Sequence, residues 1–261
     1  MKPLHWLGFA VIAFLVLFPI YWGVRTSFAE ARDASWLPRI TFEHYRYLLS
    51  QEIFYRYTRN SLVVSLGTVA AVLLIGLPAA YALAKLRFSG RRFGILFLLL
   101  PLLPAIAVLT PLISYMYRLD LLNTLSGLVV LNLVFNLPFA VWMTRGFMLA
   151  VPDAVEEAAM IDGASRLGVM ARITIPLTAT GLFAVAAFVF VQTWNNYLYA
   201  YAIISSPDQR VIPMGILASL GAWGTQWGPL MSFGTLGVLP PILLLLVFRR
   251  WFIAGMLGQV R

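Results

Sequence analysis

The sequence predicts an all-α integral membrane protein with six transmembrane helices. Hydrophobic residues make up 61% of the chain and charged residues only 11%, whereas soluble domains carry about 25% charged residues. The mean hydropathy is +0.85, and six apolar runs reach the length of about 20 residues that a spanning helix needs. We expect one membrane domain, 1–261, with spans near 6–24, 60–84, 93–117, 124–144, 177–204 and 229–248.

The first apolar run, 6–24, follows Lys2 and is expected to remain in the protein as a span. A cleaved signal peptide is the alternative. It is disfavoured because bulky Tyr21 and Trp22 end the run and no small-residue cleavage motif follows. Pro19 predicts a kink or a break in this helix.

The connections between spans differ in character. The polar stretch 25–58 is long, and we expect it to hold one amphipathic helix at the membrane interface over 45–57. The third span contains Pro101, Pro104 and Pro111, which membrane helices tolerate where neighbours or water satisfy the freed carbonyl groups. Residues 205–228 are rich in Gly and Pro and are expected to form an outer loop.

The distribution of basic residues predicts that both termini are cytoplasmic. With that orientation, eleven of the 19 Lys and Arg residues lie on the inner side, including Lys85 and three arginines directly after the second span. The short outer loops then hold only Arg118 and Arg210, as the positive-inside rule requires. Six further arginines lie in 25–59 and oppose this orientation, but long loops translocate with less regard to charge.

The segment 151–176 is too polar to cross a bilayer. Its ordered series of helix-capping and helix-ending residues also argues against an irregular loop. We expect Asp153 to cap a helix, with Glu156 three residues on completing a capping box. Gly163 should end this helix with a left-handed turn. Ser165 should cap a second short helix that stops before Pro176. The segment thus predicts two short helices joined by a glycine bend.

These residues resemble the EAA loop of binding-protein-dependent ABC importer permeases of the carbohydrate type. The resemblance rests on Glu157-Ala158-Ala159, then Gly163, then a proline at 176, where Ile175 replaces the leucine that is usual before this proline. The alternative is an ordinary amphipathic loop. The resemblance implies the six-helix ABC importer permease fold, with 151–176 as a cytoplasmic coupling loop that docks on a separate ATPase. The residues that it assigns to ATPase coupling are Glu156, Glu157, Ala158, Ala159, Asp162, Gly163 and Ala164.

Polar residues inside two spans are candidates for the substrate path. The fifth span carries amide and aromatic side chains together, which suit sugar hydroxyl groups and the apolar face of a sugar ring, and it resembles a Trp-Asn motif of carbohydrate permeases. Asn132 and Asn136 share a face of the fourth span. Hydrogen bonding between helices, or an interfacial aromatic belt, would explain the same residues. The path candidates are Asn132, Asn136, Gln192, Trp194, Asn195, Asn196, Tyr197 and Tyr199.

No catalytic or metal-binding constellation is present in the sequence. It has no cysteine and no P-loop, and the span interiors hold no Asp or Glu that would relay ions. We therefore expect no cofactor in this chain, with ATP and Mg bound by the partner ATPase. The resemblance implies a second homologous permease subunit, two ATPase subunits, an external sugar-binding protein and membrane lipid as partners, with no nucleic acid, in a bacterial or archaeal cell membrane. The alternative hypothesis is a secondary carrier that works without a partner chain. A third hypothesis is a membrane-embedded enzyme.

Overall fold

The computed structural model describes residues 3–30, 39–86, 94, 104–223 and 227–256. In these residues the chain is helical, and extended pairing is confined to one antiparallel bridge, Ala29 with Ile40. The longer helices are α1 (Pro3–Ser27), α3 (Glu52–Lys85), α5 (Ala105–Arg118), α6 (Leu125–Leu149), α10 (Ala179–Trp194), α12 (Ile212–Trp223) and α13 (Trp227–Met256). The shorter ones are α2 (Glu43–Ser50), α7 (Asp153–Ile161), α8 (Arg166–Val169), α9 (Ile175–Leu177) and α11 (Tyr197–Ile203). A π-helix (Met170–Thr174) and a 3₁₀ turn (Pro207–Gln209) complete the set.

Four of the described helices are long and apolar enough to cross a membrane. They are Gly8–Ser27, Glu52–Lys85, Leu125–Leu149 and Trp227–Arg249, with a fifth span if Arg166–Leu177 and Ala179–Trp194 are taken together. The expected third span lies partly outside the described residues. Its described part, α5, has 14 residues and begins after Pro104.

Two expectations about the connections need correction. The expected interfacial helix 45–57 is divided, because Gln51 is extended between α2 and α3. The expected loop 205–228 contains the 12-residue helix α12. Of the kink or break expected at Pro19, the break does not occur, since α1 is helical through this residue.

The chain divides into two compact units, which are described separately. One comprises Met1–Arg59 and Val211–Pro240, and the other Asn60–Arg210 and Pro241–Arg261. In the first unit, Phe54 packs edge-to-face on Phe233, with ring centroids 5.6 Å apart. Gly215 of α12 lies so close to the Tyr57 ring that an added Cβ would come within 2.5 Å of it. This close approach explains why position 215 of α12 is a glycine.

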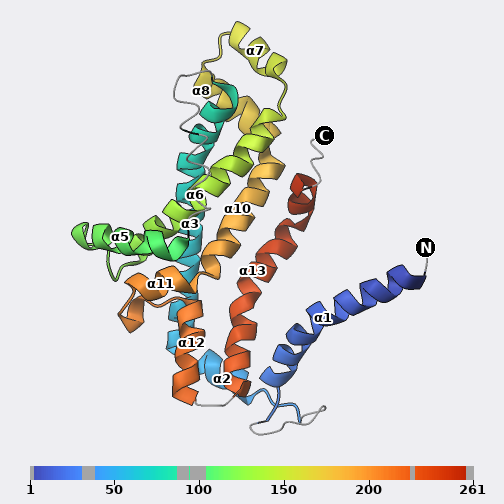
Figure 1. Ribbon diagram of the computed structural model, residues 1–261, viewed down its shortest axis with the longest axis vertical. Coiled ribbons are helices and arrows are strands. Elements are labelled where there is room, and N and C mark those ends of the chain that lie inside the picture. The colour runs from blue at the N-terminus through green and yellow to red at the C-terminus, as the bar shows by residue number, and fades with distance from the viewer. Residues whose placement is uncertain (1–2, 31–38, 87–93, 95–103, 224–226, 257–261) are drawn as a thin grey trace. The chain divides into compact units, whose positions relative to one another are not determined.

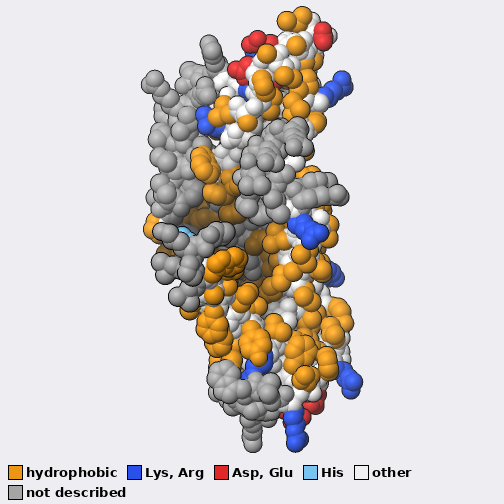
Figure 2. Space-filling model, turned by 90° about the vertical axis from the view of Figure 1, so that its right-hand side faces the viewer, with side chains coloured by type: hydrophobic (Ala, Val, Ile, Leu, Met, Phe, Trp, Pro, Cys, Tyr) orange, Lys and Arg blue, Asp and Glu red, His pale blue; other side chains and the backbone are white. Residues whose placement is uncertain are grey.

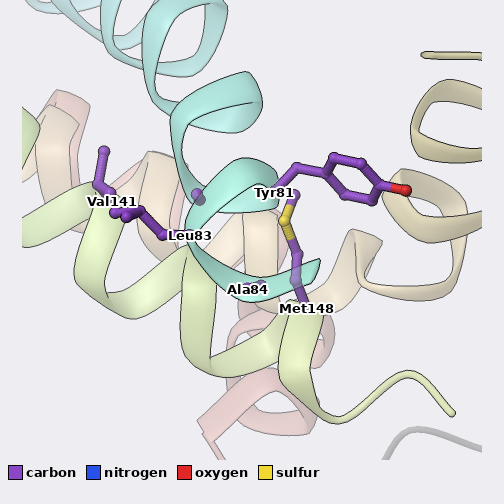
Figure 3. Close-up of a cluster of buried hydrophobic side chains, with 6 residues drawn as sticks. Tyr81, Leu83, Ala84, Val141 and Met148 are labelled. Atoms are coloured by element: carbon purple, nitrogen blue, oxygen red, sulfur yellow. The ribbon is translucent and has the colours of Figure 1, made fainter. Parts of the chain in front are cut away.

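The second unit is built on α6, α10 and the later part of α3 (Figure 1). Val72, Ala140, Val185 and Val189 form one buried cluster between these helices. A second cluster lies where α3 meets the end of α6 and contains Tyr81, Leu83, Ala84, Val141 and Met148 (Figure 3). This second cluster fixes the end of α3 beside the polar segment that follows α6.

Candidate functional site

The polar segment between α6 and α10 begins with α7, and its N-terminus differs from expectation. Asp153 is the first helical residue rather than the cap, and Pro152 at the cap position makes no side-chain hydrogen bond. The predicted capping box is therefore wrong. The physical reason is that both carboxylates have other partners: Asp153 accepts a hydrogen bond from Lys85, and Glu156 accepts one from Thr174.

The bend after α7 forms as the sequence predicts. Gly163 has a φ of +91°, in the left-handed region that favours glycine. The amide of Ala164 donates to the carbonyl of Ala159, and the amide of Gly163 donates to that of Met160. These two bonds form the Schellman motif that ends helices at glycine. The Ser165 hydroxyl then accepts a hydrogen bond from the amide of Gly168 and caps α8, as expected.

The second helix of the segment does not stop before Pro176. The chain stays helical from Arg166 to Leu177, through α8, the π-helix and α9. Pro176 lies just after the π-helix gives way to α9, in the last turn before the helical run ends at Leu177. After Thr178 the chain turns by 81° into α10.

Most residues of the expected coupling set lie on the surface of this unit. Glu157, Ala158, Asp162, Gly163 and Ala164 are exposed, and Ala159 is half-buried. Two large apolar side chains beside them are also exposed, Ile161 by 85% and Leu167 by 71%. Figure 2 shows acidic side chains gathered over the part of this unit that carries α7. Among the described residues no three His, Cys, Asp or Glu side chains come together as metal ligands.

Glu156 differs from the rest of this set because it is buried. Only 5% of the residue is exposed, and its Oε1 atom accepts a hydrogen bond of 2.7 Å from the Thr174 hydroxyl. The Nζ atom of Lys85 lies 4.0 Å from the same oxygen. The structure therefore places Glu156 inside the segment, whereas its neighbour Glu157 faces outward.

The fifth predicted span is broken in its polar stretch. Helix α10 ends at Trp194, and α11 starts at Tyr197 after the pair Asn195 and Asn196. The Asn196 side chain caps α11, with its Oδ1 atom accepting from the amide of Tyr199 at 3.0 Å. The stretch expected as the fifth span, 177–204, is therefore divided near its end, where capping by Asn196 favours a new helix start.

The other path candidates on this stretch divide into buried and exposed residues. Trp194 stacks on Phe190, and Tyr199 stacks on Phe135 with ring centroids 4.5 Å apart. Both are buried, whereas Gln192 and Asn195 are exposed and Tyr197 is half-buried against Tyr201. Among the path candidates on this stretch, Gln192 and Asn195 are thus exposed in this unit.

Asn132 and Asn136 lie buried on α6 and bond to their own helix. Their Nδ2 atoms donate to the carbonyls of Leu128 and Asn132, each at 2.8 Å. The Oδ1 atom of Asn132 is buried without a hydrogen-bond partner. Among the described residues, neither asparagine forms the hydrogen bond to another helix that the sequence left open.

Sequence reasoning missed Lys85 as a partner of the polar segment, and it missed the contact between Thr174 and Glu156. Lys85 was interpreted only as a marker of the cytoplasmic side, yet its side chain is 6% exposed and bonds to the Val151 carbonyl and to Asp153, both at 2.6 Å. A signal existed: Lys85 is one of only two lysines in the chain. Its three arginine neighbours, Arg87, Arg91 and Arg92, lie outside the described residues.

Comparison with known proteins agrees with this architecture. Residues 65–258 match the family described as "Binding-protein-dependent transport system inner membrane component". The chain is 34% identical to a probable ABC transporter permease protein, y4oR, of Sinorhizobium fredii, covering 100% of this chain and 96% of that protein. It is 31% identical to the diacetylchitobiose uptake system permease protein DasC of Streptomyces coelicolor, covering 95% and 92%.

A solved structure shares the fold. The crystal structure of a bacterial ABC transporter that imports the acidic polysaccharide alginate contains a chain that superposes with a TM-score of 0.76 at 22% identity, covering 95% of each chain. With the family match over most of the chain and spanning helices on either side of a polar segment, these likenesses identify a multi-pass inner membrane protein. The chain belongs to the binding-protein-dependent transport system inner membrane components, as a permease of the sugar ABC transporter type.

Proposed function

We propose that this chain is the permease subunit of an ATP-driven importer that moves a neutral di- or oligosaccharide into the cytoplasm. In this proposal residues 151–176 dock on a separate ATPase subunit, which binds ATP and Mg. The chain itself performs no catalysis. It works with a second, homologous permease subunit, two ATPase subunits and an external sugar-binding protein.

The exposed face of the α7–α8 bend is the observation that carries the docking proposal. Ile161 and Leu167 expose large apolar side chains beside the acidic residues Glu157 and Asp162. A protein surface that combines exposed apolar anchors with charges is typical of a partner interface. The Gly163 turn holds these residues in a defined geometry, which a surface that transmits force requires.

The proposal of a neutral sugar rests on the chemistry near the helix break. Gln192 and Asn195 expose amide groups that both donate and accept hydrogen bonds, as sugar hydroxyl groups do. A separate observation concerns the source of energy: no Asp or Glu occurs in α6, α10, α11 or α13. Ion-coupled carriers usually need such groups, so this favours an external ATPase over ion coupling. The named substrate of the Streptomyces relative, diacetylchitobiose, is of this neutral class.

The proposed orientation places both termini and the α7–α8 bend on the cytoplasmic side. It follows from the excess of Lys and Arg in the segments assigned to that side. Labelling of single cysteines introduced into this cysteine-free chain tests it directly. A membrane-impermeant reagent should label a cysteine at Ile161 only after the membrane is opened, and labelling in intact cells would contradict the proposal.

Reconstitution of the complex tests the function. The chain should be purified from its own cells together with the subunits bound to it and placed in liposomes. Uptake of radiolabelled disaccharides should then be measured with and without ATP inside the vesicles. We expect an ATPase subunit to co-purify and uptake to require ATP and the binding protein. Uptake by this chain without ATP would show a carrier working alone and would overturn the proposal.

A further inference from the structure

Lys85, at the C-terminal end of α3, makes contacts with the start of the polar segment. Its ammonium group donates to the Val151 carbonyl and to Asp153 Oδ1, each at 2.6 Å, and lies 4.0 Å from Glu156 Oε1. An ammonium group has three donors, and two of them are used here in short bonds. Since 94% of the Lys85 side chain is covered, this contact ties the end of α3 firmly to the first turn of α7.

Glu156 continues this connection toward the next helix. Its side chain is 7% exposed, and a buried carboxylate is stable only when charge and hydrogen bonds compensate its lost hydration. The Thr174 hydroxyl supplies a 2.7 Å hydrogen bond, and Tyr81 of α3 also interacts with this carboxylate. Figure 3 shows the Tyr81 hydroxyl directed away from Val141 and Leu83. Glu156 therefore interacts with Lys85 of α3 and with Thr174 of the π-helix.

Thr174 lies at the end of the π-helix and is fully buried. Its carbonyl accepts hydrogen bonds from the Thr178 amide at 3.0 Å and from the Thr178 hydroxyl at 2.7 Å. Thr178 is the residue at the 81° bend into α10. Hydrogen bonds through Thr174 thus connect Glu156 to Thr178, where the chain bends into α10.

We propose that Lys85, Glu156 and Thr174 form an internal brace that makes α7 move together with the end of α3 and the bend of α10. This inference rests on the proposed function, and it assigns Glu156 a positioning role distinct from docking on the ATPase. Without the brace, α7 would lose its side-chain bonds to α3 and to the π-helix. Such a helix would pivot when pulled, and the motion of the ATPase would be lost at the loop.

Two conservative variants test the brace in the reconstituted complex. Thr174→Val keeps the shape of the side chain and removes the donor, and Glu156→Gln keeps the size and removes the charge. For each, three quantities are measured: ATPase subunit co-purified per permease chain, ATP hydrolysis rate, and sugar transported per ATP hydrolysed. The matched control is Glu52→Gln, which breaks an exposed ion pair with Arg56 at the other end of α3.

We expect both brace variants to retain the co-purified ATPase and its hydrolysis within about twofold. Sugar transported per ATP should fall about tenfold in Thr174→Val, which removes the donor of a charge-assisted hydrogen bond. It should fall by a similar or smaller factor in Glu156→Gln, which keeps an acceptor for Thr174 but loses the charge that faces Lys85. The double variant should lose little more than either single one, because both changes open the same connection. Glu52→Gln should match the unaltered protein in all three quantities.

Two outcomes would overturn the brace. If sugar transported per ATP is unchanged in Thr174→Val and Glu156→Gln, these contacts do not couple the motion of α7 to α3 and α10. If the co-purified ATPase falls in proportion to transport, Glu156 acts through docking or folding instead. Failure of the proposed function itself looks different, since the unaltered protein would then show neither a co-purified ATPase nor ATP-dependent uptake.

Discussion

The α7–α9 segment and the break between α10 and α11 are both polar stretches in an apolar chain, yet their side chains bond differently. In the first, hydrogen bonds join residues that are far apart in sequence, such as Lys85 with Asp153 and Glu156 with Thr174. In the second, Asn196 bonds to a backbone amide three residues away. Hydrogen bonds of the first kind, between residues far apart in sequence, join different helices. A hydrogen bond of the second kind, between near neighbours, stabilises the start of one helix.

The asparagines of α6 resemble the second kind. Asn132 and Asn136 each donate to a carbonyl four residues earlier in the same helix. Such bonds are available in any helix and need no partner from elsewhere. This comparison predicts that substitutions in the α7–α9 segment disturb several elements together, whereas those on α6 and α11 stay local.

The largest expected effect is that of Lys85→Met. It would leave Glu156 buried without a cation, which costs about 3 kcal/mol for a buried pair. Hydrogen exchange of the α7 amides should become roughly 100-fold faster, since about 1.4 kcal/mol corresponds to tenfold. Arg56→Met, which breaks the exposed pair with Glu52, should cost below about 1 kcal/mol. Equal rates of hydrogen exchange in the two variants would show that the buried contact of Lys85 stabilises α7 no more than the exposed pair of Arg56 and Glu52 does.

Gly163→Ala comes next. Nothing lies within 4 Å of an added Cβ there, so the cost comes from the backbone alone, about 1–2 kcal/mol for an L-residue at positive φ. Protease cleavage within residues 161–166 should accelerate accordingly. Gly146→Ala is the matched control, because it also meets no atom but lies inside helix α6, where alanine is favoured over glycine. Similar cleavage in the two variants would argue against a strained turn.

Asn196→Ala should lower stability by about 1 kcal/mol through loss of the α11 cap. Asn196→Ser retains a capping oxygen and should be nearly neutral. Thermal unfolding in detergent measures the stability of both variants, and sugar uptake measures their function. If Asn196→Ser unfolds normally but loses uptake, Asn196 contacts the substrate in addition to capping the helix.

The smallest effect is expected for Asn132→Leu, a change within about 1 kcal/mol. The substitution removes a buried oxygen that has no hydrogen-bond partner, so the loss of the local bond is offset by better burial. The midpoint of thermal unfolding and the uptake rate should both stay close to those of the unaltered protein. Loss of uptake at unchanged stability would place Asn132 on the substrate path.

Local features of the segment were largely predictable from its sequence. The glycine bend and the Ser165 cap depend on residues within a few positions, and both form as expected. The capping box at Asp153 and the stop before Pro176 also rested on local rules, and both failed. The capping box failed because Lys85 and Thr174 supply partners for its two carboxylates, which a local rule does not include. The stop failed because the π-helix and α9 carry the helical run on past Pro176.

The sequence by itself determined the membrane class, the approximate positions of the described long helices and the motif of the polar segment. Composition, apolar run length and turn residues act over short stretches of chain, so they can be interpreted without coordinates. Only the tertiary structure decided that Glu156 faces inward while Glu157 faces outward, and that Lys85 meets residues 66 and 68 positions away. Such pairings depend on how helices pack, and no spacing in the sequence encodes the distance between them.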